Sequence, residues 1–297
     1  MVIPQAGIFA LGPQIHAYLE YDLALWAEPV DLISTIAGVC TTGSTVGAFN
    51  LVCGFRPELW CASNPSKAPT QAASFREPII GADGYTIPAT QHDVVLWASG
   101  ATYDEVFDLA GSLTFGLRAV AVLADETTGW NYHHDLDLTG FRHGTENPPL
   151  SAAPAMVLVP EGAPGAGGSV MLLQKWEHDA DAWVKLPVAV QEHIIGRTKS
   201  DSIELTERTA TSHSVRTDQD RFGHIFRRIT PYGCLRQHGT VFVGFSTARD
   251  PLHAMLESMA GVHGPRDDLT RYARAVSSGY YFVPSLDDLT EFAAPDP

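Results

Sequence analysis

Residues 140–148 read GFRHGTENP and lie near the middle of a chain of 297 residues. One series of predicted strands and helices ends just before this stretch, and a second series begins after it. The sequence therefore predicts two units, residues 1–140 and residues 141–297, with GFRHGTENP at the start of the second unit.

The first half alternates between the hydrophobic patterns of strands and helices. Strands are predicted at residues 15–21, 46–55, 92–99 and 117–123, and helices at 29–39 and 102–115. The helix at 102–115 has acidic residues in its first turn, as the helix dipole favours. The resulting order is β-α-β-β-α-β, which is that of a ferredoxin-like unit.

The second half follows a glycine-rich linker at residues 160–168. Strands are predicted at 169–176 and 240–245, and helices at 187–195 and 250–259, with a long irregular stretch between them. We interpret this half as a second β-α-β-β-α-β unit with a large insertion. The predicted fold class is α+β: two ferredoxin-like units with antiparallel sheets and peripheral helices.

Composition and charge argue against some classes of partner. Hydrophobic residues make up 45% and charged residues 18% of the chain, as in soluble globular proteins. The formal net charge of −15 disfavours nucleic acid and anionic membranes, because both favour clustered Lys and Arg. No run reaches the ~18 apolar residues expected of a membrane span. We therefore expect no nucleic-acid partner and no membrane partner.

The cysteines indicate a reducing compartment. Cys40, Cys53, Cys61 and Cys234 include no Cys-x-x-Cys pair, which argues against a zinc ribbon, a thioredoxin-type site and a disulfide framework. The N-terminal residues lack a basic segment followed by a long apolar stretch. We expect buried or free thiols and a cytoplasmic location.

GFRHGTENP resembles the GFxDGTENP signature of dye-decolorizing peroxidases, a family of haem enzymes. Further segments resemble the family in the same order: QKWEH at 174–178, QEHIIGRTK at 191–199, TSHSVR at 211–216 and GYYFVPSL at 279–286. The resemblance implies the dimeric α+β barrel architecture with haem b in the second unit. It also implies reduction of hydrogen peroxide, oxidation of dyes or other aromatic donors, and assembly into a homo-oligomer.

The resemblance also implies the residues of a haem site. His213 matches the axial iron ligand, and its other ring nitrogen needs an acceptor, which makes the ligand more electron-donating. Asp267 is the candidate acceptor, and Asp268 is the alternative. Arg227 is expected as the distal cation, with Arg228 as the competing candidate. Gly144 and Thr145 are expected beside the haem, and Arg197 as a propionate partner or a packing residue.

The chain departs from the family signature at His143. The family carries an aspartate there, which is thought to move the proton of the iron-bound peroxide. His143 could act as a base, bind iron as a sixth ligand opposite His213, or point away and leave Arg227 to act alone. Unperturbed pKa values are ~3.9 for aspartate and ~6.5 for histidine, so a histidine base predicts activity that rises toward neutral pH.

Two other functions remain open at this point. Aldoxime dehydratases share the dimeric α+β barrel architecture and use a distal histidine and arginine on haem, so His143 and Arg227 also fit that reaction. A bis-histidine protein, with His143 and His213 on iron, would bind haem without turnover. The sequence does not identify the physiological electron donor.

One further cluster contains residues that could bind a metal. His133 and His134 are followed by Asp135. Adjacent residues on a strand point to opposite faces, so both histidines cannot easily reach one ion. A surface or structural role is therefore favoured for this cluster.

Overall fold

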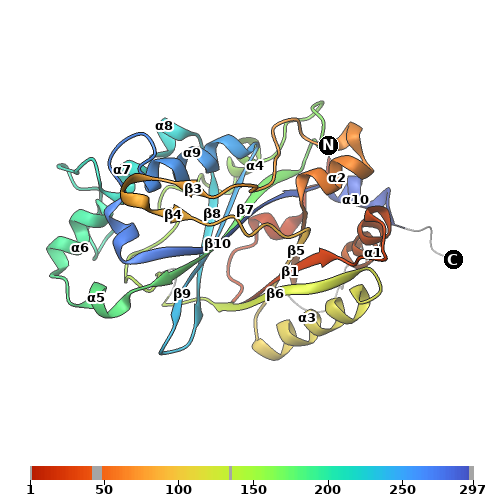
Figure 1. Cartoon of the computed structure of the whole chain (residues 1–297), viewed down its shortest axis with the longest axis horizontal. Helices are drawn as coiled ribbons and strands as arrows, with labels where there is room; N and C mark the ends of the chain where they lie inside the picture. Colours follow the sequence, from red (N-terminus) through yellow and green to blue (C-terminus); the bar gives the residue numbers. More distant parts are fainter. Residues whose placement is uncertain (1, 42–48, 134–135, 294–297) are drawn as a thin grey trace.

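The structure of the protein is a computed structural model. It describes residues 2–41, 49–133 and 136–293, and the structural statements below concern these residues. Eight strands in this part of the chain close into one barrel (Figure 1). They are β1 (Ile15–Leu23), β2 (Asn50–Phe55), β5 (Val94–Gly100), β6 (Ala121–Trp130), β7 (Ser169–His178), β8 (Phe226–Gly233), β9 (His238–Ser246) and β10 (Ala273–Val283). Neighbouring strands of the barrel are antiparallel.

The barrel consists of two sheets that have the same internal order. The first half of the chain forms β6-β1-β5-β2, and the second half forms β10-β7-β9-β8. If the four barrel strands of each half are numbered 1 to 4 along the chain, both sheets have the spatial order 4-1-3-2. Two copies of one β-α-β-β-α-β unit give this order, so the predicted α+β fold of two ferredoxin-like units is confirmed.

The two sheets meet along short seams. Phe282 of β10 pairs with Phe55 of β2 at one seam, and Gly129 of β6 pairs with Tyr232 of β8 at the other. Within a sheet the ladders are longer, since β7 and β10 pair along their whole length from Ser169 to His178. Closure of the barrel therefore joins two sheets that each have their own extensive hydrogen bonding.

Helices of the first half cover the outer face of its sheet. They are α1 (Pro29–Thr41) and α3 (Tyr103–Leu117). A capping box starts α3, in which the side chains of Thr102 and Glu105 each accept a backbone N–H of the other residue. Because α3 continues to Leu117 and β6 begins only at Ala121, the strand predicted at 117–123 starts too early.

The second half has a different arrangement of helices. One long helix, α9 (Arg249–Ala260), packs on the outer face of its sheet. The connection from β7 to β8 is an insertion with four short helices, α5 (Ala180–Val184), α6 (Val188–Ile195), α7 (His213–Arg216) and α8 (Gln219–Phe222). Figure 1 shows α5, α6 and α7 at the opposite end of the molecule from α1 and α3.

Strand alternation divides the apolar interior into three layers. Trp97 and Leu173 face the inside of the barrel, whereas their chain neighbours Leu96 and Leu172 face the helices outside the two sheets. Successive residues of a strand point to opposite faces, which explains the division. Two short helices complete these layers: α4 (Ala153–Val157) packs into the barrel interior, and α10 (Leu286–Thr290) packs beside α1.

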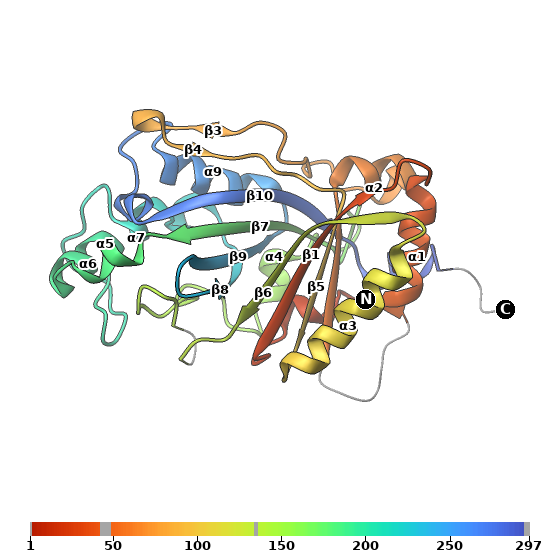
Figure 2. The same cartoon turned by 60° about the horizontal axis from the view of Figure 1, so that its bottom comes forward.

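The segment between β2 and β5 crosses from the first half to the second. It contains α2 (Pro57–Ser63) and a hairpin of β3 (Ile79–Ile80) and β4 (Thr86–Ile87), which runs beside α9 and β10 (Figure 2). A Cβ on Gly81 would lie 1.9 Å from the carbonyl oxygen of Ala260, so the hairpin packs directly on the end of α9. No strand is predicted at residues 79–87, because two-residue strands have no measurable period.

A disulfide contradicts the expected state of the cysteines. Cys40 in α1 and Cys53 in β2 are bonded, whereas Cys61 and Cys234 are free and exposed. The expectation of four unpaired thiols is wrong. Cysteine spacing does not reveal this bond, because it joins a helix to the neighbouring strand on which the helix packs.

Two further expectations concern membranes and metals. None of the helices described here is long and apolar enough to cross a membrane. His134 and Asp135 of the predicted His-His-Asp cluster lie outside the described residues. His133 is exposed, and its ring centroid lies 4.2 Å from that of Tyr132.

Candidate active site

A cavity lies on the outer face of the second sheet. Residues of β7, β8, β9, α9 and the β7–β8 insertion line it, and its empty volume is about 1190 Å³, part of which is open to solvent. The structure brings five residues of the predicted site to its wall: His143, Thr145, Arg197, His213 and Arg227.

His213 is the first residue of α7, and its neighbours fix the start of this helix. The hydroxyl of Ser212 donates to the carbonyl oxygen of His193 at 2.8 Å. Gly196 ends α6 with φ 85°, and a Cβ at this position would lie 2.2 Å from Oγ of Ser214. Glycine therefore allows the end of α6 to approach α7 closely, which explains its place in the QEHIIGRTK segment.

His213 is paired with the buried carboxylate of Asp267. Nδ1 of His213 lies 2.7 Å from Oδ2 of Asp267, whose side chain has no exposed surface. The other oxygen, Oδ1, accepts the backbone N–H of Leu269 at 2.8 Å. An ionised carboxylate only accepts hydrogen bonds, so Nδ1 donates, and Nε2 is the nitrogen that is left to bind a metal.

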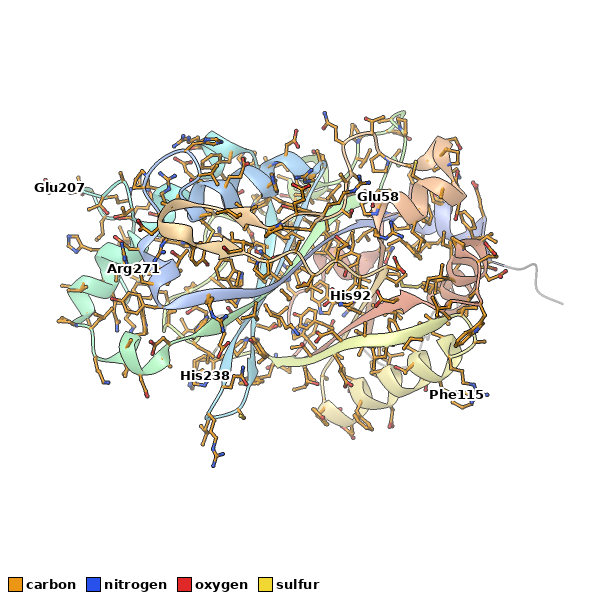
Figure 3. The ribbon with its side chains drawn as sticks, in the orientation of Figure 1. Glu58, His92, Phe115, Glu207, His238 and Arg271 are labelled. Atoms are coloured by element: carbon orange, nitrogen blue, oxygen red, sulfur yellow. A yellow bond between two sulfur atoms is a disulfide. The ribbon has the colours of Figure 1, made fainter. Side chains whose placement is uncertain are left out.

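Asp268, the alternative acceptor, is engaged elsewhere. Its Oδ1 accepts from Nε of Arg271 at 3.1 Å, and its backbone N–H donates to the carbonyl of Thr211 at 3.0 Å. Figure 3 shows Arg271 on the part of the chain that follows α9. Of the two candidate acceptors, the geometry therefore favours Asp267.

Asn147 clamps the 140–148 loop to strand β8. Its Nδ2 donates to the carbonyl oxygen of Arg227, and its Oδ1 accepts the N–H of the same residue, both at 2.9 Å. Gly144 has φ 69°, and its carbonyl accepts the N–H of Asn147, so the loop turns back after His143. The clamp brings His143 and Arg227 to one cavity from distant parts of the chain.

The Asn147→Ala variant is expected to lower the free energy of unfolding by about 2–4 kcal/mol. It removes two hydrogen bonds and leaves backbone groups of Arg227 without these partners, at about 1–2 kcal/mol each. Denaturant unfolding of both proteins measures the difference. Asn64→Ala is a matched control, because Asn64 accepts one exposed hydrogen bond from Ser66. Equal midpoints for Asn147→Ala and the unaltered chain would contradict the clamp.

Arg197 lies in the cavity wall with its guanidinium already paired. Its Nη2 lies 2.6 Å from Oε1 of Glu146 and 3.0 Å from Oε1 of Glu204, and its Nη1 donates to the carbonyl of Ser202 at 2.9 Å. Glu146 belongs to the 140–148 loop. The ion pairs and hydrogen bond of Arg197 therefore join this loop to the β7–β8 insertion.

Some wall residues are missing from the predicted site. Helix α9 contributes an apolar stripe of Leu252, Met255, Leu256 and Met259, whose helical period is visible in the sequence. Asp137 also lines the cavity, and burial raises the pKa of its carboxyl group. It accepts from the N–H and the hydroxyl of Thr139, and no sequence motif points to it.

The donor set and the walls fit a haem. A histidine with a buried carboxylate partner is a typical axial ligand arrangement, and the α9 stripe offers apolar surface for a porphyrin. His143 and Arg227 add a polar group and a cation to the same space. Fold and site together define a haem enzyme of α+β barrel architecture.

Comparison of the sequence with known proteins leads to one family. The Dyp-type peroxidase C-terminal family model matches residues 134–288. The dye-decolorizing peroxidase of Mycolicibacterium paratuberculosis is 34% identical over 218 residues, which span 70% of this chain and 62% of that protein. The dye-decolorizing peroxidase of Rhodococcus erythropolis is 32% identical over 275 residues, which span 88% of this chain and 80% of that protein.

Solved structures agree with the sequence relatives. A dyp-type peroxidase protein from Shewanella oneidensis matches with a TM-score of 0.91 and 29% identity, over 99% of this chain and 100% of that chain. DyPB from Rhodococcus jostii RHA1 matches with a TM-score of 0.88 and 28% identity, over 97% of both chains. The chain belongs to the dye-decolorizing peroxidase family, whose members are haem-dependent peroxidases.

Proposed function

We propose that this chain reduces hydrogen peroxide and oxidises aromatic donors such as dyes and phenols, with haem b as cofactor and His213 as axial iron ligand. The observation that carries the proposal is the His213–Asp267 pair at a cavity that His143 and Arg227 also line. Haem supplies an iron that binds peroxide and accepts its oxidising equivalents. Asp267 makes the imidazole of His213 more electron-donating, which favours O–O cleavage.

On the distal side we assign separate tasks to Arg227 and His143. The permanent charge of Arg227 stabilises the negative charge that develops on the departing peroxide oxygen. When haem is bound, the imidazole of His143 would accept the proton of one peroxide oxygen and return it to the other oxygen, which leaves as water. Over a full cycle, one hydrogen peroxide and two phenols give two waters and two phenoxyl radicals.

His143 is proposed as a base rather than as an iron ligand or a bystander. The Asn147 clamp holds its loop against Arg227, so both side chains belong to one wall. A Rhodococcus jostii DypB variant with histidine in place of an aspartate was solved in complex with heme. That structure supports the idea that such an exchange is compatible with haem in this family.

The optical spectrum of the purified protein, with and without hydrogen peroxide, tests this function. We expect a Soret band, a high-spin five-coordinate ferric spectrum, a spectral change on adding peroxide, and dye oxidation faster than with free haem. A low-spin ferric spectrum without a response to peroxide would instead support a bis-histidine haem protein. Nitrile formation from an aldoxime would support a dehydratase, which the family comparisons do not favour.

The rate of peroxide reduction is expected to rise at least about tenfold between pH 4 and pH 6.5. An imidazole with an ordinary pKa of ~6.5 is protonated at pH 4 and becomes a usable base as the pH rises. His143→Ala is expected to lose this dependence and about 10²–10⁴-fold in kcat/KM for peroxide. A maximum near pH 4, with no loss in His143→Ala, would contradict the role of His143 as base.

Acid unfolding must be separated from this pH profile. Burial lowers the pKa of His16 and that of His178 to about 4. Their folded-state pKa values lie below the ~6.5 of an unfolded histidine, so their stabilisation is complete above pH ~6.5 and is lost toward pH 4. Circular dichroism at each pH identifies the range in which the protein is folded, and rates are compared only within it.

Three further residues are proposed to contact the haem. Thr145 and Arg197 line the cavity. Gly144, with positive φ, forms the turn between His143 and Thr145. We propose that Arg197 pairs with a haem propionate, as a guanidinium can pair bidentately with a carboxylate. This requires Glu146 or Glu204 to give up part of its present contact with Arg197.

The expected homo-oligomer is proposed to form through the outer side of α3. Tyr103, Phe107 and Phe115 are 57%, 60% and 64% exposed there, and Figure 3 shows Phe115 at the outer edge of the molecule. Gly111 lies between Phe107 and Phe115, and a Cβ at this position would meet no atom from outside the helix backbone within 4 Å. Two copies crossing antiparallel at Gly111 place Phe107 against the partner's Phe115.

The same symmetry pairs opposite charges. Asp104 and Arg118 are both exposed and both lie seven residues from Gly111, so each faces the other residue of the second copy. Trp26, 73% exposed, donates to the carbonyl of Ala119 and extends the apolar surface at this end of α3. A self-complementary patch of this kind fits a two-fold symmetric dimer.

Phe107→Asp is expected to convert a dimer into a monomer. The symmetric interface would contain the new charge twice, each time against an aromatic ring. Light scattering after size-exclusion chromatography measures the mass at micromolar concentration. Val188→Asp, at a 53% exposed apolar position on α6, is the control that should leave the mass unchanged. A monomeric unaltered chain, or an unchanged mass for Phe107→Asp, would contradict the interface.

A cytoplasmic location stays a prediction, as does the absence of nucleic-acid and membrane partners. The net charge of −15 supports the predicted absence of nucleic-acid and membrane partners. The Cys40–Cys53 disulfide does not favour a cytoplasmic location, since such bonds are rare in reducing compartments. Cell fractionation tests the location.

A further inference from the structure

A second space adjoins the proposed haem cavity along strand β8. This antechamber has an empty volume of about 960 Å³, part of it open to solvent, and is bounded by residues 10–13, residues 147–150 and β8. The antechamber and the cavity share four wall residues: Arg142, His143, Arg227 and Ile229. A molecule in the antechamber therefore lies against residues that also face the proposed haem.

The wall of the antechamber is cationic, although the chain as a whole is acidic. Arg142, Arg227 and Arg228 line it, and among the described residues no aspartate or glutamate does. His16 is also in the wall, and burial lowers its pKa to about 4, so it is neutral near pH 7. In a chain of net charge −15, three arginines around one space without an acidic residue in its wall favour an anionic ligand.

Two of these arginines differ in their exposure and in their contacts. The buried side chain of Arg228 is fixed, because its Nη2 donates to the carbonyl of Ala10 at 2.9 Å and its guanidinium lies 4.4 Å from the ring centroid of Phe226. Arg142 comes from the 140–148 loop and is exposed. A guanidinium on such a loop can pair with a carboxylate that enters from solvent.

Apart from the arginines, the wall contains the polar side chains of Asn131, Asn147 and Thr230 and a larger number of apolar residues. Leu11, Pro13, Pro148, Leu150 and Phe226 contribute to it. Apolar walls with few polar groups are typical of sites for organic ligands rather than inorganic ions. A ring with one carboxylate satisfies both the walls and the arginines.

We propose that the antechamber binds an aromatic carboxylate that carries a phenolic hydroxyl, and that such phenolic acids are a preferred donor class of this enzyme. This inference rests on the proposed peroxidase function and narrows its donor. Each phenolic acid gives up one electron and its hydroxyl proton, and two of them reduce one hydrogen peroxide to two waters.

Calorimetric titration of the haem-loaded protein tests the binding site without relying on turnover. The probes are 4-hydroxybenzoate, the neutral 4-hydroxybenzamide of similar shape, and acetate, which has the charge without the ring. We expect 4-hydroxybenzoate to bind at least about tenfold more tightly than either of the others. Arg142→Gln should remove this preference and leave binding of the amide unchanged. Arg236→Gln, in the β8–β9 turn, is the control.

Each outcome decides one part of the proposal. Equal affinity for the acid and the amide overturns the role of the arginines, and equal affinity for acetate overturns the aromatic site in favour of a simple anion site. Oxidation of a neutral phenol, guaiacol, is measured in parallel. If guaiacol is oxidised but 4-hydroxybenzoate shows no binding preference, the donor class is wrong and the peroxidase function stands. If the acid binds preferentially but no donor is oxidised, the peroxidase function fails.

Discussion

The His213→Ala variant is expected to purify with less than about one tenth of the haem of the unaltered chain. Loss of groups that merely orient a ligand typically costs 10–100-fold in metal affinity, and loss of the ligand itself should cost at least as much. Asp267 would also lose the partner of its buried carboxylate. The measurement is the haem absorbance per mole of protein after reconstitution and gel filtration.

Two companion variants separate iron binding from folding. His224→Ala changes another, exposed histidine of the same insertion and should keep its haem. Asp267→Asn keeps the residue shape but weakens the acceptor, so it should bind haem with a spectrum altered at the axial ligand. Full haem content with an unchanged five-coordinate spectrum in His213→Ala would show that another residue binds iron.

The Arg227→Leu variant is expected to keep its haem and to lose about 10²–10³-fold in kcat/KM for hydrogen peroxide. Removing one group that stabilises charge in a transition state typically costs about 2.7–4 kcal/mol, which corresponds to this range. The rate of the spectral change after mixing with peroxide measures the step directly. Haem content is measured in the same samples, because the loss must occur at equal occupancy.

A lysine at this position separates charge from geometry. Arg227→Lys keeps a cation but loses the planar guanidinium, so its rate should lie between those of the unaltered chain and Arg227→Leu. Arg221→Leu, on the exposed side of α8, controls for removal of a positive charge from the same region. An unchanged peroxide rate in Arg227→Leu would assign the distal chemistry to His143 alone.

Much of the architecture follows from local sequence patterns. The alternation at residues 15–21 predicts β1, and Thr102 with Glu105 marks the start of α3, because both signals lie within one element. The repeated order of elements predicts two ferredoxin-like units. Closure into one barrel does not follow from these patterns, since each seam depends on a single described pair such as Phe55 with Phe282.

Candidate site residues can be predicted from the sequence where they lie in a recognisable motif. His213, Arg227 and His143 lie in segments that resemble the family, and the structure brings all three to one cavity. The Asn147 clamp is not predictable in this way, because its side chain bonds to backbone atoms 80 positions away. A motif shows that Asn147 is present but not what it contacts.

The proposed haem cavity occupies the place that a helix fills in the other half of the molecule. In the first unit α1 connects the first two strands and packs Leu32, Ile33 and Ile36 on the outer face of its sheet. In the second unit the equivalent connection is the insertion, and the cavity lies on that face of the sheet. The cofactor would then complete a hydrophobic layer of the fold, so that haem supply and resistance to proteolysis are linked. A free haem concentration of 100 times Kd would add about 2.7 kcal/mol to the stability of the folded chain, and haem starvation would expose it to degradation.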